Sequence, residues 1–299
     1  MKNRLIIFLL TNFLFTLNLF AYYEFKSGGT YEFSFQYLQS NAGGYYDLNG
    51  KLITSISKGE NELSDYLFDF KNYCFKLNFE YSISNKLVIG VESPINYYNL
   101  TETYKNSDGS MGAEKANLTL FKIQYIGIKS SYIIYEKKKR TGNAIGFICG
   151  ELRLPTAYDG SIYNSKYQLL DGGLTEVKIG AGINVNLAKS FIEAIGKFSY
   201  RSYEPANYFD FHFETGFETV PDTKLYLHSD IVQSLSSLKS SPALTITRTP
   251  ERENYISGGF GFDIYFNKQI KSNFIYSIIL NGRNTWNWGM FAIGIYYYI

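Results

Sequence analysis

The sequence predicts an all-β fold, a transmembrane antiparallel up-and-down β-barrel of about 12 strands. Three observations predict it: apolar and polar residues alternate with a period of two along most of the chain, an apolar leader precedes that region, and short connections alternate with long ones. In such a barrel every second side chain meets lipid and the others face the lumen. The mean hydropathy of only -0.16 fits that division.

The first residues have the layout of a secretory signal peptide. Two basic residues precede an apolar run at 5–20, and the small residue Ala21 offers a cleavage point. A membrane-anchoring helix is the alternative, but four polar residues interrupt the run and disfavour it. We therefore expect a signal peptide over residues 1–21 and one barrel domain over 22–299.

The composition excludes several classes of function. The chain has 29 Lys and Arg against 27 Asp and Glu, and removing the two basic residues of the leader leaves 29 − 2 = 27 of each sign. A near-neutral chain of this kind argues against nucleic acid as a partner. No P-loop or Rossmann glycine pattern occurs, and no cofactor is expected. Cys74 and Cys149 have no zinc spacing, so we interpret them as unpaired strand residues, with a disulfide as the alternative.

Twelve alternating segments are the predicted strands. They lie near residues 29–40, 66–82, 86–98, 116–135, 143–156, 173–187, 190–203, 207–219, 223–235, 254–266, 271–281 and 286–299. A count of 14 is the alternative if residues 41–65 contribute a hairpin inside the membrane. The 207–219 strand shows the pattern clearly, because its phenylalanines alternate with Asp210, His212 and Glu214.

The connections sort by parity along the chain. Those after even-numbered strands are short and turn-like, whereas those after odd-numbered strands are long, at 41–65, 99–115, 157–172 and 236–253. Outer-membrane barrels have short periplasmic turns and long outer loops, which gives this parity. The final segment, GMFAIGIYYYI, resembles the C-terminal strand of bacterial outer-membrane barrels, although Ile299 stands where Phe is usual.

From about Leu87 onward the chain resembles a known bacterial outer-membrane family. The residues that carry the resemblance are LVIGVESPINYY at 87–98, GELRLPTAYDG at 150–160, GGLTEVKIGAGINVNL at 172–187 and SFIEAIGKFSYRSY at 190–203. The family is known as "MetA-pathway of phenol degradation" and is related to the long-chain fatty-acid outer-membrane transporters. The resemblance implies a channel for small hydrophobic or aromatic solutes.

Charged side chains on the predicted inward face are the candidate pore-lining residues. They are Glu151, Arg153, Glu176, Lys178, Glu193, Lys197, Arg201, Asp210, His212, Glu214, His228 and Asp230. Glycines on the same face, at 180, 182, 259 and 261, remove bulk; the alternatives are that they leave space for a solute or that the lumen is simply packed.

The two histidines raise the alternatives of a metal site and a catalytic site. His212 and His228 lie on adjacent predicted strands, each with an acidic residue two positions away. A metal needs three or four converging ligands, and polar-in strands produce such clusters by chance, so no metal is expected. The string His228, Ser229, Asp230 suggests a hydrolase, but alternation turns Ser229 away from both neighbours, so no catalytic residue is expected.

These patterns predict a non-enzymatic channel or transporter in the outer membrane of a Gram-negative-type bacterium. It would pass small solutes, hydrophobic or aromatic ones among them. Its expected partners are outer-membrane lipid, the barrel-assembly machinery and the solute. The alternatives are a non-transport barrel whose outer loops bind a surface partner, and a barrel hydrolase.

Overall fold

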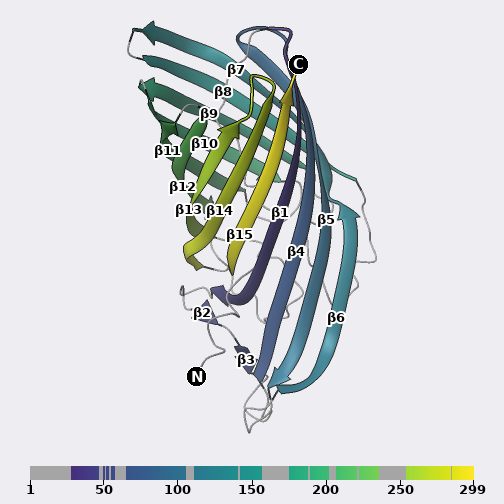
Figure 1. Ribbon diagram of the computed structural model, residues 1–299. Helices are drawn as coiled ribbons and strands as arrows, with labels where there is room; N and C mark the ends of the chain where they lie inside the picture. Colours follow the sequence, from purple (N-terminus) through teal and green to yellow (C-terminus); the bar gives the residue numbers. More distant parts are fainter. Residues whose placement is uncertain are drawn as a thin grey trace.

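A computed structural model describes residues 28–46, 50, 52–53, 55–57, 65–105, 111–140, 142–156, 175–187, 189–201, 207–220, 222–235, 254–283 and 285–299. These residues form one closed β-barrel (Figure 1). The strands are β1 (Tyr31–Tyr46), β2 (Leu52–Ile53), β3 (Ser55–Ser57), β4 (Asp65–Ser82), β5 (Leu87–Lys105), β6 (Met111–Ile123), β7 (Tyr125–Lys139), β8 (Gly142–Pro155), β9 (Glu176–Leu187), β10 (Ser190–Arg201), β11 (Tyr208–Val220), β12 (Thr223–Ser234), β13 (Asn254–Tyr265), β14 (Ile270–Arg283) and β15 (Thr285–Tyr298). In these ranges there is no helix long and apolar enough to cross a membrane.

The wall consists of antiparallel neighbours in chain order. β1 closes the barrel because it pairs with β15 on one side and with β4 on the other. The short strands β2 and β3 pair only with the ends of β1 and β4 in the described part of the chain. β6 and β7 both pair with β5 and together serve as one wall strand. The wall thus has the 12 strands that the alternation predicts.

The division between β6 and β7 arises at a proline in the facing strand. Pro94 of β5 has no N–H to donate to the ladder. Ile123 pairs with Ile95 and Gly127 pairs with Glu92, so a step of four residues on this side faces a step of three on β5. The extra residue forms a bulge in which Gln124 and Tyr125 are consecutive and both buried. The single predicted strand at 116–135 is therefore bent at this point.

The outer face of the wall is apolar and the inner face is largely polar. Phe33, Ile179 and Leu227 are 47%, 66% and 63% exposed, whereas Glu193 is 0% exposed. Exposed apolar stripes opposite buried charges reverse the arrangement of a soluble sandwich, and they are typical of a barrel that stands in lipid. Cys74 and Cys149 are free and buried on the inner side.

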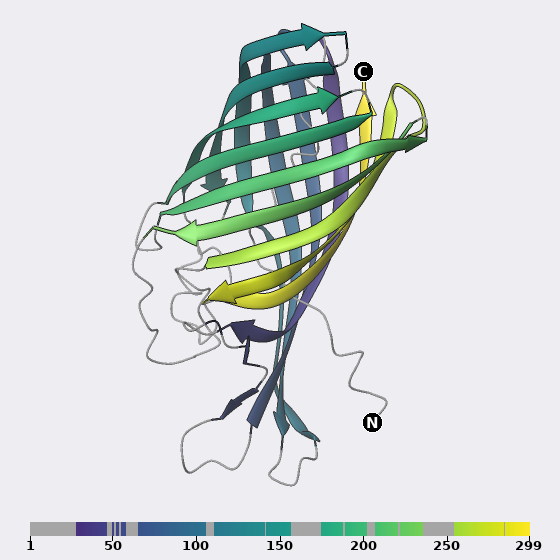
Figure 2. The same ribbon diagram turned by 90° about the vertical axis from the view of Figure 1, so that its left-hand side faces the viewer.

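The predicted loops differ at two places from the structure. β1 continues to Tyr46 and β5 to Lys105, and β6 begins at Met111, so 41–65 and 99–115 contain strand that we expected to be loop. Strand pairing continues beyond the part of the wall whose outer side chains are apolar. In these extensions the sequence shows no apolar–polar alternation, so they were expected to be loop. β4, β5 and β6 consequently project beyond the other strands (Figure 2). The predicted loops 157–172 and 236–253 and the leader 1–21 lie outside the described residues.

Candidate lumen site

The structure places the 12 candidate pore-lining residues on the inner side of β8 to β12. Nine of them are at most 9% exposed; the other three, Arg201, Asp210 and His212, are half-buried. Their alternation with lipid-facing neighbours is the one that the sequence predicts, for example Lys178 at 2% beside Ile179 at 66%. Nine of these side chains form ion pairs with one another; the others are Glu193, Lys197 and His228.

Glu176 is the centre of one ion-paired network. Its carboxylate accepts hydrogen bonds from Arg153 Nη1 at 2.9 Å, from Arg201 Nε at 2.9 Å and from Tyr208 Oη at 2.7 Å. Glu151 accepts from the Nε of the same Arg153. The Arg201 guanidinium also lies 4.5 Å from the centre of the Tyr208 ring, a cation–π distance. The contacts link β8, β9, β10 and β11 across their inner faces.

A second network surrounds Glu92 of β5. Lys76 Nζ lies 2.8 Å and Lys129 Nζ 3.7 Å from Glu92 Oε2, and Lys129 also reaches Glu80 at 2.6 Å. Tyr125 Oη donates to Glu92 at 2.8 Å, while the Tyr125 ring lies beneath the Arg153 guanidinium at 4.7 Å. Tyr125 thus joins the two networks, and paired charges line the inner wall from β4 to β11.

The histidines take part in a separate contact set. His212 Nδ1 lies 2.7 Å from Asp230 Oδ1, and Ser257 Oγ donates to Asp230 Oδ2 at 3.1 Å. Ser229 Oγ instead bonds the Ser257 carbonyl oxygen at 2.9 Å, so no Ser–His–Asp alignment forms. In the described ranges no group of three or more His, Cys, Asp or Glu could hold a metal ion.

Of the two alternatives for the inner glycines, the structure fits packing. A Cβ at Gly182 would lie 2.5 Å from the Phe147 ring, and one at Gly261 would lie 2.4 Å from Cζ of Tyr226. One at Gly180 would lie 2.6 Å from Lys197 Cγ. Neighbouring side chains therefore occupy the room that each missing Cβ provides.

An apolar patch on the inner side was not predicted from the sequence. It is called the apolar inner wall here, and its buried members are Ala42, Phe191, Tyr208, Tyr226, Val232, Tyr255, Ile275, Ile279, Trp288, Met290 and Ala292. It covers β10 to β15 and β1, and it adjoins the ion-paired wall at β10 and β11, where Tyr208 belongs to both. Alternation along the strands could have predicted it. Tyr226 shares a face with His228 and Asp230, and Ile275 shares a face with Asn273 and Ser277, so both lie inward.

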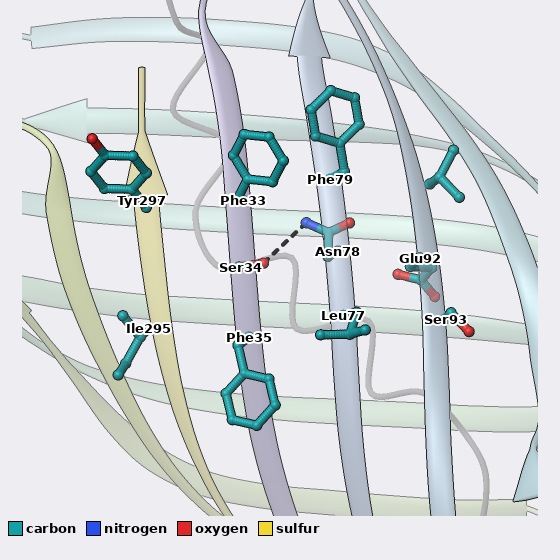
Figure 3. Close-up of a pocket in the computed structure, with 11 residues that line it drawn as sticks. Phe33, Ser34, Phe35, Leu77, Asn78, Phe79, Glu92, Ser93, Ile295 and Tyr297 are labelled. Carbon is teal, nitrogen blue, oxygen red and sulfur yellow. Dashed lines mark hydrogen bonds between the residues drawn. The ribbon is translucent and has the colours of Figure 1, made fainter.

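The outer face holds a separate groove of about 610 Å³ across β15, β1, β4 and β5 (Figure 3). Two cross-strand rows form its sides, Tyr297–Phe33–Phe79–Val91 and Ile295–Phe35–Leu77–Ser93. In the row between them Asn78 Nδ2 donates to Ser34 Oγ at 3.2 Å. Since Phe33 and Leu77 are 47% and 48% exposed, the groove opens toward the bilayer and is separate from the lumen.

The fold is similar to that of a known outer-membrane channel. The COG4313 outer membrane channel from Pseudomonas putida F1 matches with a TM-score of 0.66 and 12% identity, over 92% of this chain and 97% of that one. The KdgM porin (TM-score 0.46, 7% identity, 89% and 98% covered) and the CymD monoaromatic hydrocarbon channel (0.39, 8%, 91% and 88%) are more distant. No protein-family model and no curated protein matches the sequence.

The first of these similarities confirms the fold expected from the sequence: a closed, all-β outer-membrane barrel of 12 antiparallel strands.

Proposed function

We propose that this chain is an outer-membrane channel through which small hydrophobic or aromatic solutes pass along the apolar inner wall. The observation that carries the proposal is the position of that wall inside a barrel whose outside is already apolar. Water-filled pores for ions need no such surface, whereas an apolar solute gains free energy from each apolar side chain it contacts. The ion-paired candidate residues of β8 to β11 form the polar part of the same passage, which adjoins the apolar inner wall at Tyr208.

The proposal includes the export, the location and the non-enzymatic role of the chain. Residues 1–21 direct export and are removed, and residues 22–299 fold as one barrel with the help of the barrel-assembly machinery. The outer membrane is the location that the apolar outer belt and the fold suit. The protein uses no cofactor and performs no catalysis, which agrees with the orientation of Ser229 away from the His212–Asp230 pair.

Deletion of an outer loop separates this function from binding of a surface partner. Vesicles with lipopolysaccharide in the outer leaflet are needed, because apolar solutes cross a simple phospholipid bilayer unaided. We expect a barrel lacking residues 236–253 to keep or increase the uptake of an apolar fluorescent probe into such vesicles. Loss of all uptake by a deletion variant that is still folded would contradict passage through the lumen and favour a loop-based function.

A further inference from the structure

Of the ten buried polar side-chain atoms within the described residues that have no hydrogen-bond partner, two lie in the same cross-strand row of the ladder at the apolar inner wall. They are Nε2 of His228, whose residue is 6% exposed, and Oγ of Ser277, which is 0% exposed. A buried donor or acceptor without a partner loses its hydration and receives nothing in return, so folded proteins retain few of them. Two in one place indicate that something else bonds them.

Both atoms lie beside the same glycine. The ladder places His228 opposite Gly259, and Gly259 opposite Ser277. A Cβ at Gly259 would lie 2.8 Å from His228 Cε1 and 2.8 Å from Ser277 Cα. Because Cε1 is bonded directly to Nε2, the imidazole leans over Gly259 toward Ser277. The imidazole and Ser277 thus flank the same position on the inner face of β13, where Gly259 has no side chain.

The neighbouring acidic groups do not bond His228 Nε2. Asp230, two residues from His228, is bonded by His212 and by Ser257. Glu214 stands opposite His228 in the ladder, and its Oε2 lies at an ion-pair distance of 3.8 Å from Nε2 of His212. The hydrogen-bonding capacity of His228 Nε2 is therefore not used by the acidic groups around it.

Apolar side chains surround the pair on the remaining sides. Met290 is opposite Ser277 in the ladder, and the next inward row contains Tyr226, Ile275 and Ala292. The rings of Tyr226 and His228 are 6.5 Å apart. Met290 has a long, unbranched and adaptable side chain, which makes it the part of this surface that can move aside for a ligand.

We propose that His228 and Ser277 bind the single polar oxygen of an otherwise apolar solute, while its hydrocarbon part contacts Tyr226, Ile275 and Met290. The oxygen is a hydroxyl or a carbonyl. A serine hydroxyl donates or accepts a hydrogen bond, and a neutral imidazole nitrogen does either according to its tautomer. The pair can therefore bind a hydroxyl or a carbonyl oxygen. The inference rests on the proposed function and adds the polar group that the preferred solutes carry.

A matched pair of probes tests the site. Cyclohexanol and methylcyclohexane have nearly the same shape and differ in a hydroxyl for a methyl group. Both are titrated into the refolded barrel in detergent, with fluorescence of Trp288, two residues from Met290, as the readout. The ratio of the two dissociation constants is compared between wild type, Ser277→Ala and His228→Phe, so that the different water solubilities of the probes cancel. Ser272→Ala is the control on the same strand, because its hydroxyl bonds the Gly294 carbonyl oxygen on the outer side.

We expect the preference for cyclohexanol to fall about tenfold in Ser277→Ala and in His228→Phe, the effect of one hydrogen bond of ordinary strength. The affinity for methylcyclohexane should stay unchanged, and Ser272→Ala should match wild type. Both variants should also unfold at the wild-type denaturant concentration or above it, since no internal hydrogen bond is lost.

Four results would overturn the inference. An unchanged probe ratio in both variants would mean that the two atoms bond only water. Clear destabilisation of Ser277→Ala would mean that its hydroxyl has an internal partner. Binding of neither probe by folded wild-type barrel would contradict the proposed function itself, and the inference with it; binding of both without discrimination would contradict the inference alone.

Discussion

Replacement of Glu176 is the sharpest test of the ion-paired wall. Glu176→Ala removes the acceptor of hydrogen bonds from Arg153, Arg201 and Tyr208, and it leaves Arg153 with Glu151 as its remaining carboxylate in the network. Both arginine side chains are at most 8% exposed, so water replaces little of what is lost. Breaking a buried pair from one side typically costs about 3–5 kcal/mol, because an uncompensated charge stays behind.

The assay is urea unfolding of the barrel in phospholipid vesicles, followed by tryptophan fluorescence. Glu136→Ala is the matched control, since Glu136 pairs with Lys138 at 2.9 Å but the lysine side chain is 76% exposed. An exposed pair of this kind contributes less than about 1 kcal/mol. If Glu176→Ala cost no more than Glu136→Ala, the interior would be well hydrated and the view of a tightly paired wall would be refuted.

Three further predictions concern the two faces of the barrel. Leu77→Arg should reduce the free energy of unfolding in vesicles by about 2–4 kcal/mol, as for an arginine placed among lipid tails, and a cost near zero would mean that Leu77 does not face lipid. Gly261→Val should cost at least about 1–3 kcal/mol by overpacking, because its Cβ would lie 2.4 Å from Tyr226; wild-type stability in the same unfolding assay would contradict that contact. The wild-type barrel should show a reversal potential near zero in a salt gradient, since its lumen charges are paired. Glu176→Gln removes one negative charge and should shift the reversal potential toward anion selectivity. A shift toward cation selectivity would contradict the charge assignment.

The sequence predicts the wall strands well because lipid makes alternation an unusually strict signal. A strand such as Ser190–Arg201 must present an apolar residue at every second position on the outside, and register then fixes which side chains face inward. The inward position of Glu193 and Lys197 follows directly from that rule. The extensions of β5 and β6 are not predictable in this way, since a strand beyond the lipid belt has no apolar side to show.

The contacts inside the lumen are less predictable because they join strands that are distant in sequence. Tyr125 reaches Glu92 and Arg153, and this arrangement depends on the bulge beside Gln124 and Pro94. The apolar inner wall was missed for a different reason: only charged residues of the inward face were taken as candidates. Alternation already places Ile275 on the same face as Asn273 and Ser277, so its inward position could have been predicted.

Passage of an apolar probe across a membrane with a lipopolysaccharide outer leaflet tests the central claim most directly. The measurement compares wild type with Ile275→Asn, which places an amide on the apolar inner wall, and with Ile195→Asn, which makes the same change in a separate buried cluster. Heat-dependent gel mobility verifies that each barrel is folded. We predict that Ile275→Asn lowers the flux about tenfold, as expected when an apolar solute must pass a polar group that costs about 1.4 kcal/mol, while Ile195→Asn stays close to wild type. Equal flux through all three folded barrels, or no flux through wild type, would contradict passage along the apolar inner wall.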